Sequence, residues 1–188
     1  MSHSRPSTPP PSMMAAEPPC KRSRLSNVHP VFAGYEEGIR TTSIPPQNTG
    51  NSNCGVYACA FVAEWFEWTT PIDTADFVGL RDGTSVHNLL NRLRGSNHNK
   101  IAMQRFTLAD SLQRFTETLQ TSASSPIITS VTDLDNAEGH WMVVFDKNNG
   151  KLSVFDPIDG NIYRVPVDVF CSKFATDMPE TLIQITNV

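Results

Sequence analysis

The chain has 188 residues and a formal net charge of −4, with 14 prolines and four cysteines. This length suits a single domain with a full hydrophobic core. Basic residues outnumber acidic ones near the start, so the rest of the chain is distinctly acidic. That balance argues against nucleic acid as a partner, because phosphate binding needs clustered lysine and arginine.

Residues 1–28 differ in composition from the rest, with six prolines, many serines and few large apolar side chains. Such a segment cannot offset its ordering entropy by burial, so we predict a disordered tail followed by one folded domain over 29–188. Lys21, Arg22 and Arg24 suit either a nuclear import signal or a solvated basic patch. The chain shows no signal peptide, no apolar run long enough to span a bilayer and no disulfide-framework spacing. These features predict an intracellular protein, cytoplasmic or nuclear, without a membrane partner.

The first half of the domain has the patterns of helices. Asn53 is a candidate N-cap for a helix over 56–66 that is apolar nearly all round and is therefore expected to be buried. Ser85 precedes a second helix, whose apolar residues recur at i, i+3, i+4 and i+7 until Gly95. A third helix is predicted over 107–119, with a capping threonine at its start.

The second half has the patterns of strands. Apolar, β-branched and aromatic residues predict strands over four segments: 126–132, 140–146, 151–156 and 181–186. The run Asn148-Asn149-Gly150 between two of them is a strong hairpin signal. Helices followed by an antiparallel sheet indicate an α+β domain.

Four residues have the chemistry of a thiol nucleophile system. Cys54 begins the apolar helix, and a helix N-terminus lowers the pKa of a thiol, further so beside an imidazolium. His140, at the start of a strand, would hold the thiolate and later protonate a leaving group. Asp156 on the next strand would fix the tautomer of the ring. Gln47, together with the Cys54 backbone N–H, would stabilise an oxyanion.

The register of the predicted hairpin decides whether His140 and Asp156 can meet, because strand faces alternate at every residue. A tight two-residue turn places Val143 opposite Asp156 and directs His140 to the other face. A three-residue loop places Met142 opposite Asp156, and His140 becomes its diagonal neighbour on the same face. A five-residue loop gives the same parity. The catalytic interpretation therefore predicts a bulged turn.

Other side chains compete for the roles of acid and base: Asp146 and Asp159, and His87 and His98. Cys59 lies inside the first helix and is expected to be a core residue, as is Cys171, whereas Cys20 belongs to the tail. Trp141 would either shield the thiol and the imidazole from water or simply belong to the core. No metal-ligand spacing and no phosphate-binding glycine loop occur, so we expect no metal and no cofactor.

These residues resemble the papain-like cysteine peptidases: Gln-(x)6-Cys-Gly, a buried helix, Gly-His-Trp and Phe-Asp-Pro-x-x-Gly follow in the order of that family. Over residues 44–162 the layout is most similar to the double-glycine leader peptidases that process bacteriocins. The segments CGVYACAF and HWMVVFD are also similar to the ubiquitin-like-protein (SUMO) proteases, in which they occur in the opposite order. Gln47 lies one residue further from Cys54 than is usual, which leaves Asn48 as an alternative oxyanion donor.

The resemblance implies a papain-like fold, with the cysteine helix packed on the sheet, and a cysteine peptidase that hydrolyses a peptide or isopeptide bond. It implies a protein or peptide substrate cut after a small residue, such as a ubiquitin-like protein with a Gly-rich C-terminus or a polyprotein. Two alternatives stay open. A thiol acyltransferase uses the same order of Cys, His and Asp, and an inactive binding module would keep the fold alone, although the complete set of four residues argues against it. A viral or a cellular origin fits equally.

Overall fold

The computed structural model describes the following residues: 32, 34–38, 42–47, 53–74, 84–97, 101–105, 117, 125–133, 138–172 and 182–187. The tail predicted over 1–28 lies outside them. So does the helix predicted over 107–119, apart from residue 117.

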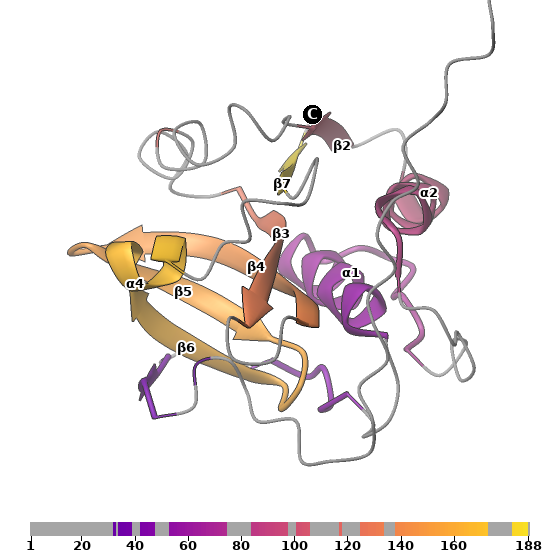
Figure 1. Cartoon of the computed structure of the whole chain (residues 1–188). Coiled ribbons are helices and arrows are strands. Elements are labelled where there is room, and N and C mark those ends of the chain that lie inside the picture. Colours follow the sequence, from indigo (N-terminus) through magenta and orange to yellow (C-terminus); the bar gives the residue numbers. More distant parts are fainter. Residues whose placement is uncertain are drawn as a thin grey trace, which may run out of the picture.

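One seven-stranded sheet forms the centre of the domain (Figure 1). Its strands are β1 (Glu36–Glu37), β2 (Ile101–Arg105), β3 (Ile127–Asp133), β4 (Glu138–Asn148), β5 (Lys151–Asp156), β6 (Asn161–Pro166) and β7 (Leu182–Asn187). They lie in the order β1-β6-β5-β4-β3-β7-β2, and each neighbouring pair is antiparallel. The predicted α+β class with an antiparallel sheet is confirmed.

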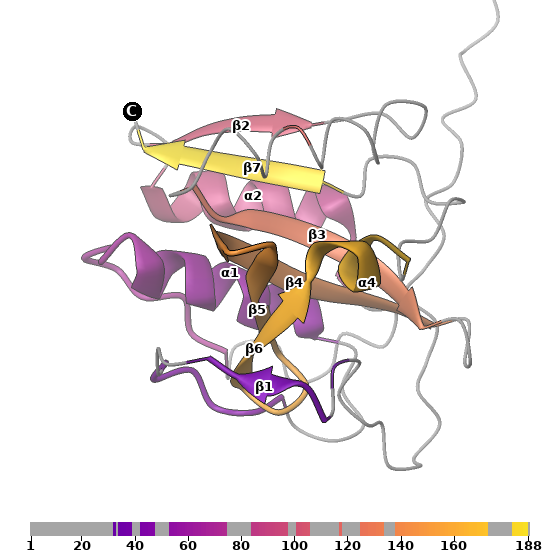
Figure 2. The same ribbon diagram turned by 90° about the vertical axis from the view of Figure 1, so that its left-hand side faces the viewer.

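Helices cover both faces of this sheet (Figure 2). On one face, α1 (Cys54–Trp65) and α2 (Val86–Asn97) share a hydrophobic cluster with residues of β4 and β5. On the other face, the short helix α4 (Val167–Ser172) packs its Phe170 into a second cluster. None of the helices that the structure describes has the length and apolar character to cross a membrane.

Helix α1 is buried along nearly its whole length, from Cys54 to Ala63. Its small residues allow close approach to the sheet, and Phe61 stacks on Phe155 of β5 with ring centroids 4.4 Å apart. Asn53 occupies the N-cap position, but its side chain makes no capping hydrogen bond. The helix is thus placed mainly by apolar packing, which brings its first turn to the start of β4.

The turn between β4 and β5 is the tight two-residue type. Asn148 pairs with Lys151, and the two residues between them, Asn149 and Gly150, have φ values of 51° and 74°. Positive φ at both central positions is what a type I′ turn requires, and Asn-Gly is its preferred sequence. The prediction of a three- or five-residue loop was therefore wrong.

A β-bulge in β4 shifts the pairing of β4 with β5 by one residue, the shift that the longer turn was expected to give. The register of β4 shifts at Phe145, so that beyond this point Val143 faces Phe155. One extra residue in one strand reverses the parity of the pairing. His140 and Asp156 consequently lie on the same face of the sheet, as the catalytic interpretation required. The physical cause is a bulge inside the strand.

Candidate active site

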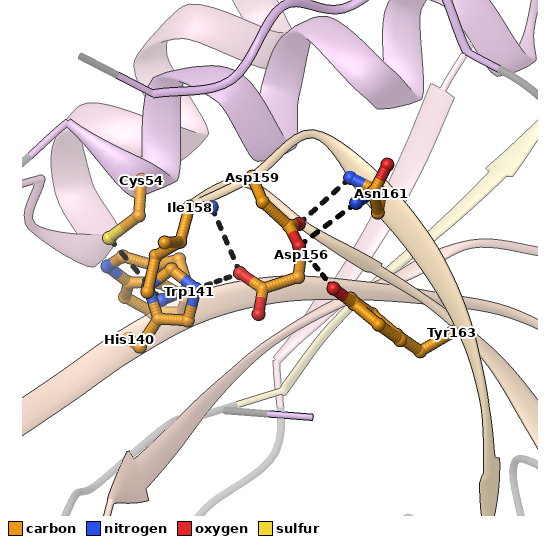
Figure 3. A network of polar contacts seen from close by, with 8 residues as sticks. All are labelled: Cys54, His140, Trp141, Asp156, Ile158, Asp159, Asn161 and Tyr163. Atoms are coloured by element: carbon orange, nitrogen blue, oxygen red, sulfur yellow. Dashed lines mark hydrogen bonds and ion pairs between the residues drawn. The ribbon is translucent and has the colours of Figure 1, made fainter. Parts of the chain in front are cut away.

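Cys54 is the first residue of α1 and lies against the backbone of β4. Its Sγ accepts a hydrogen bond from the backbone N–H of Trp141 at 3.4 Å (Figure 3). Trp141 directly follows His140, so the thiol reaches the start of the strand that carries the predicted base. An N–H directed at sulfur stabilises a thiolate relative to a thiol, and the positive end of the helix dipole acts in the same sense.

Trp141 connects three segments around this thiol. Its indole N–H donates to the carbonyl oxygen of Thr84 at 2.8 Å, while its backbone N–H contacts the sulfur. Thr84 also packs directly on Gly55, where an added Cβ would lie 2.6 Å from the Thr84 Cβ. The side chain of Trp141 belongs to the same apolar cluster as α1. Trp141 is therefore a core residue that also contacts both the Cys54 thiol and the Thr84 segment.

His140 and Asp156 form a buried pair. The His140 Nε2 lies 2.7 Å from the Asp156 Oδ1, with 7% and 0% of the two residues exposed. The same oxygen accepts the backbone N–H of Ile158 at 3.0 Å. A carboxylate accepts but cannot donate, so the Nε2 atom carries the proton of this contact. In the neutral ring, Nδ1 is then the nitrogen that can take a proton from a thiol.

The two competing aspartates have other positions. Asp159 accepts hydrogen bonds from the backbone and side-chain nitrogens of Asn161, at 3.0 and 3.1 Å, and from the Tyr163 hydroxyl (Figure 3). Burial, and next the hydrogen bond to Asp159, raise the pKa of Tyr163, so the phenol keeps the proton it donates. Asp146 is exposed on the far side of the bulge. Of the three aspartates, Asp156 is the one that faces the imidazole.

Among the other candidate histidines and cysteines, the structure describes the side chains of His87 and Cys59. His87 is exposed on α2, with its Nε2 atom 2.8 Å from the Asn91 side-chain nitrogen. Cys59 is completely buried in the middle of α1, and burial raises the pKa of its thiol. The remaining alternatives lie outside the described residues: Cys20, Asn48 and His98. The side chain of Cys171, on α4, is not among those described.

Gln47 and the three residues before it lie against the turn that follows Asp156. The Gln47 backbone N–H donates to the carbonyl oxygen of Pro157 at 2.8 Å. Gly160 in the same turn has a φ of 72°, and an added Cβ there would lie 3.0 Å from the Ile44 carbonyl oxygen. Such close contact requires glycine at this position. The predicted oxyanion donor is thereby attached to the turn that follows the predicted acid.

Two contacts of this site were not predicted from the sequence. The hydrogen bond from the Ile158 N–H to Asp156 is a side-chain turn of the kind that aspartate commonly makes with the residue two positions later, so the Asp-Pro-x-x-Gly pattern was its signal. The contact between Thr84 and Trp141 had no signal, because the two residues are distant in sequence. Within the described part of the chain, no cluster of three His, Cys, Asp or Glu side chains could hold a metal ion.

No family model matches this chain, and no curated protein matches it in sequence. Solved structures do. A double-glycine motif protease from an AMS/PCAT transporter, in complex with the leader peptide, has a TM-score of 0.54 at 15% identity and covers 85% of this chain and 98% of its own. The peptidase domain of Streptococcus ComA, a bifunctional ABC transporter of a quorum-sensing pathway, has a TM-score of 0.53 at 18% identity, covering 77% and 96%. A protein described as a C39-like peptidase, from Bacillus anthracis, has a TM-score of 0.50 at 12% identity, covering 83% and 95%.

This likeness is one of fold: the chain has the papain-like fold of these peptidase domains, as the resemblance implied. One of these neighbours is a double-glycine motif protease, the type whose layout was predicted as most similar, and the likeness in fold confirms that prediction.

Proposed function

We propose that this chain is a cysteine peptidase that hydrolyses a peptide bond, with Cys54 as nucleophile and His140 as general base and acid. The observation that carries the proposal is the sequence of contacts around the start of β4. The Cys54 sulfur lies on the Trp141 N–H, and the adjacent His140 is held by a buried carboxylate through Nε2. Asp156 positions the ring so that Nδ1 exchanges the proton.

In the acylation step, the Cys54 sulfur attacks the substrate carbonyl carbon, its proton having passed to Nδ1 of His140. A C–S bond forms, and the carbonyl electron pair moves onto the oxygen. The backbone N–H of Cys54 and the side-chain amide of Gln47 donate to that oxyanion. When the intermediate collapses, the C–N bond breaks and the departing amine takes the proton from Nδ1. A thioester on Cys54 remains.

In the second step, His140 takes a proton from water as the water oxygen attacks the thioester carbonyl carbon. The tetrahedral intermediate collapses with loss of the C–S bond, which releases the carboxylic acid product and regenerates the thiolate–imidazolium pair. Throughout, Asp156 accepts from Nε2 and stabilises the positive charge that the ring carries in each half reaction. No cofactor takes part in these steps.

For the substrate, we propose a peptide or protein with glycine or another small residue before the scissile bond. Cys54 and His140 are 4% and 7% exposed, so a carbonyl can approach the sulfur only if little side chain accompanies it. The neighbour crystallised with a leader peptide, a double-glycine motif protease, supports a peptide substrate of this kind. A ubiquitin-like protein with a Gly-rich C-terminus meets the same requirement and is the second substrate to test.

The test is hydrolysis by the full chain of matched peptides that carry Gly-Gly, Ala-Ala or Val-Val before the cleaved bond, followed by mass spectrometry of the products. We expect cleavage after Gly-Gly to be fastest. Cys54→Ala should reduce turnover by roughly 10⁴-fold or more, as removal of a nucleophile does in comparable triads. Cys59→Ala, on the same helix, should retain most of it.

A second pair of variants tests the assignment of the acid. Asp156→Ala should lower turnover more than Asp159→Asn, because Asp156 is the residue in contact with the imidazole. No cleavage of any glycine-containing peptide or ubiquitin-like protein by the folded chain would refute the proposed function. So would full activity of Cys54→Ala.

A further inference from the structure

The segment that leads to Gln47 is fixed at its other end by α1. Ser43 donates its backbone N–H to the Glu64 Oε2 atom at 2.9 Å, and the Ser43 hydroxyl donates to the same oxygen. Glu64 lies in the last turn of α1, whose first residue is Cys54. One helix therefore carries the nucleophile at its start and an anchor for the oxyanion segment near its end.

The chain between Ser43 and Gln47 is short and stiff. It consists of Ile44, Pro45 and Pro46, and each proline ring fixes φ near −65°. A residue before proline is itself restricted to extended conformations. Displacement at Ser43 is therefore passed on to Gln47, because the intervening bonds have little freedom to absorb it.

The opposite end of the segment has its own support, the hydrogen bond from the Gln47 N–H to Pro157 and the close contact with Gly160. These contacts hold the Gln47 end of the segment against the turn. Both donors of Ser43 meet one carboxylate oxygen, and hydrogen bonds to an ionised acceptor are stronger than neutral ones. The Ser43–Glu64 contact is thus suited to fix the Ser43 end of the segment on α1.

We propose that Glu64 is a positioning residue for the reaction, acting through Ser43 and the Pro45-Pro46 pair to place Gln47 at the developing oxyanion. The role rests on the proposed function, because it concerns the donor of that same site. Oxyanion stabilisation depends on donor placement within a fraction of an ångström, and a misplacement of about 1 Å costs as much as roughly 100-fold in rate.

The experiment compares two reactions of Cys54 in the full chain. Alkylation by iodoacetamide requires the thiolate but forms no oxyanion, whereas hydrolysis of a Gly-Gly peptide requires both. Glu64→Ala should lower kcat for hydrolysis by about tenfold or more with little change in KM, and leave the alkylation rate within about twofold of the wild type. Glu64→Gln keeps a side-chain oxygen acceptor and should recover part of the lost kcat.

Ser43→Ala removes the hydroxyl donor but keeps the backbone N–H, so its loss of kcat should be smaller than that of Glu64→Ala. Glu67→Gln is the matched control, since it removes an exposed carboxylate just beyond α1 and should change neither reaction. A parallel fall of hydrolysis and alkylation in Glu64→Ala would overturn the proposal, because Glu64 would then act on the thiol or the fold. Unchanged kcat would overturn it as well. A wild-type chain that is alkylated but hydrolyses none of the peptides would instead refute the proposed function, and this role with it.

Discussion

The two described cysteines of α1 lie five residues apart, and burial alone does not distinguish them. Cys54 is 4% exposed and Cys59 is 0% exposed. Their polar surroundings differ. Cys54 begins the helix and accepts the Trp141 N–H, whereas Cys59 lies one turn and more inside the apolar cluster, where burial raises its pKa and Arg92 offsets that only in part.

This difference indicates that position along the helix, more than exposure, sets the polar surroundings of a cysteine. The first N–H groups of a helix have no acceptor within it, so a thiol at the start meets hydrogen-bond donors and the positive end of the dipole. A thiol in the middle meets neither.

The largest effect should appear in thiol labelling. In the native chain, iodoacetamide should modify Cys54 at least about 100-fold faster than Cys59, with labelling of Cys54 persisting below pH ~6, as expected of a thiolate–imidazolium pair. Cys59 should react only when the chain unfolds. Rates come from fragment-ion mass spectrometry over a pH series. His140→Ala should remove the labelling of Cys54 at low pH, and equal rates for the two thiols would contradict the comparison.

The buried helix and four of the strands could be predicted from the sequence, because each follows from a local pattern of apolar residues. The apolar run after Cys54 predicts a buried helix whatever it packs on, and the β-branched and aromatic segments predict β3, β4, β5 and β7. The requirement that His140 and Asp156 share a face was also a correct deduction, because it follows from strand geometry alone.

The feature that places His140 and Asp156 on one face could not be predicted. Asn149-Gly150 forms the tight turn that its sequence favours, and the needed offset comes from the bulge at Phe145. A bulge of this kind needs no glycine, and Phe145 suits a regular strand equally well. Strand geometry therefore shows that His140 and Asp156 must share a face of the sheet if they are to meet, but no local pattern marks Phe145 as the bulge that brings them there.

The other features that were not predicted from the sequence, strands β1 and β2 and the contact of Thr84 with Trp141, depend on pairing between distant segments. Strand β1 consists of two exposed glutamates, Glu36 and Glu37, and it exists because β6 pairs with it. Strand β2 likewise forms against β7, the last strand of the chain. Such strands depend on their partners more than on their own propensity, so a local pattern does not reveal them. The contact of Thr84 with Trp141 is non-local in the same way.

A smaller effect is expected from Gly55→Ala, which tests the packing at the Cys54 end of the helix. Alanine normally stabilises a helix interior relative to glycine by up to about 1 kcal/mol. Here the added methyl would lie 2.6 Å from the Thr84 Cβ and 2.9 Å from a Leu89 methyl. We therefore expect the opposite sign, a loss of about 1–3 kcal/mol in the free energy of unfolding.

Urea unfolding of the wild type and Gly55→Ala measures this change, and native-state labelling of the same samples locates it. Cys54 should lose part of its labelling rate, because its helix end is displaced, while Cys59 should stay protected in the folded fraction. A variant as stable as the wild type, or more stable, would mean that α1 does not approach Thr84 as closely as this packing requires.

The smallest effect concerns Cys59 and alkaline pH. Because burial raises the pKa of this thiol above its ordinary value of 9.0, the unfolded chain releases the proton at a lower pH than the folded chain does. The native state then binds more protons, so the stability that Cys59 contributes is fully present below pH 9.0 and decreases above it, by at most about 1.4 kcal/mol per pH unit.

Urea unfolding of the wild type and of Cys59→Ala from pH 7 to 10 measures the difference in the free energy of unfolding between the two proteins. Tyr163 and all other titrating groups occur in both proteins and cancel in that difference. The advantage of the wild type over Cys59→Ala should therefore shrink as the pH rises past 9. A constant difference would mean that Cys59 ionises as easily in the folded chain as in the unfolded one, and the distinction between the start and the middle of α1 would then rest on Cys54 alone.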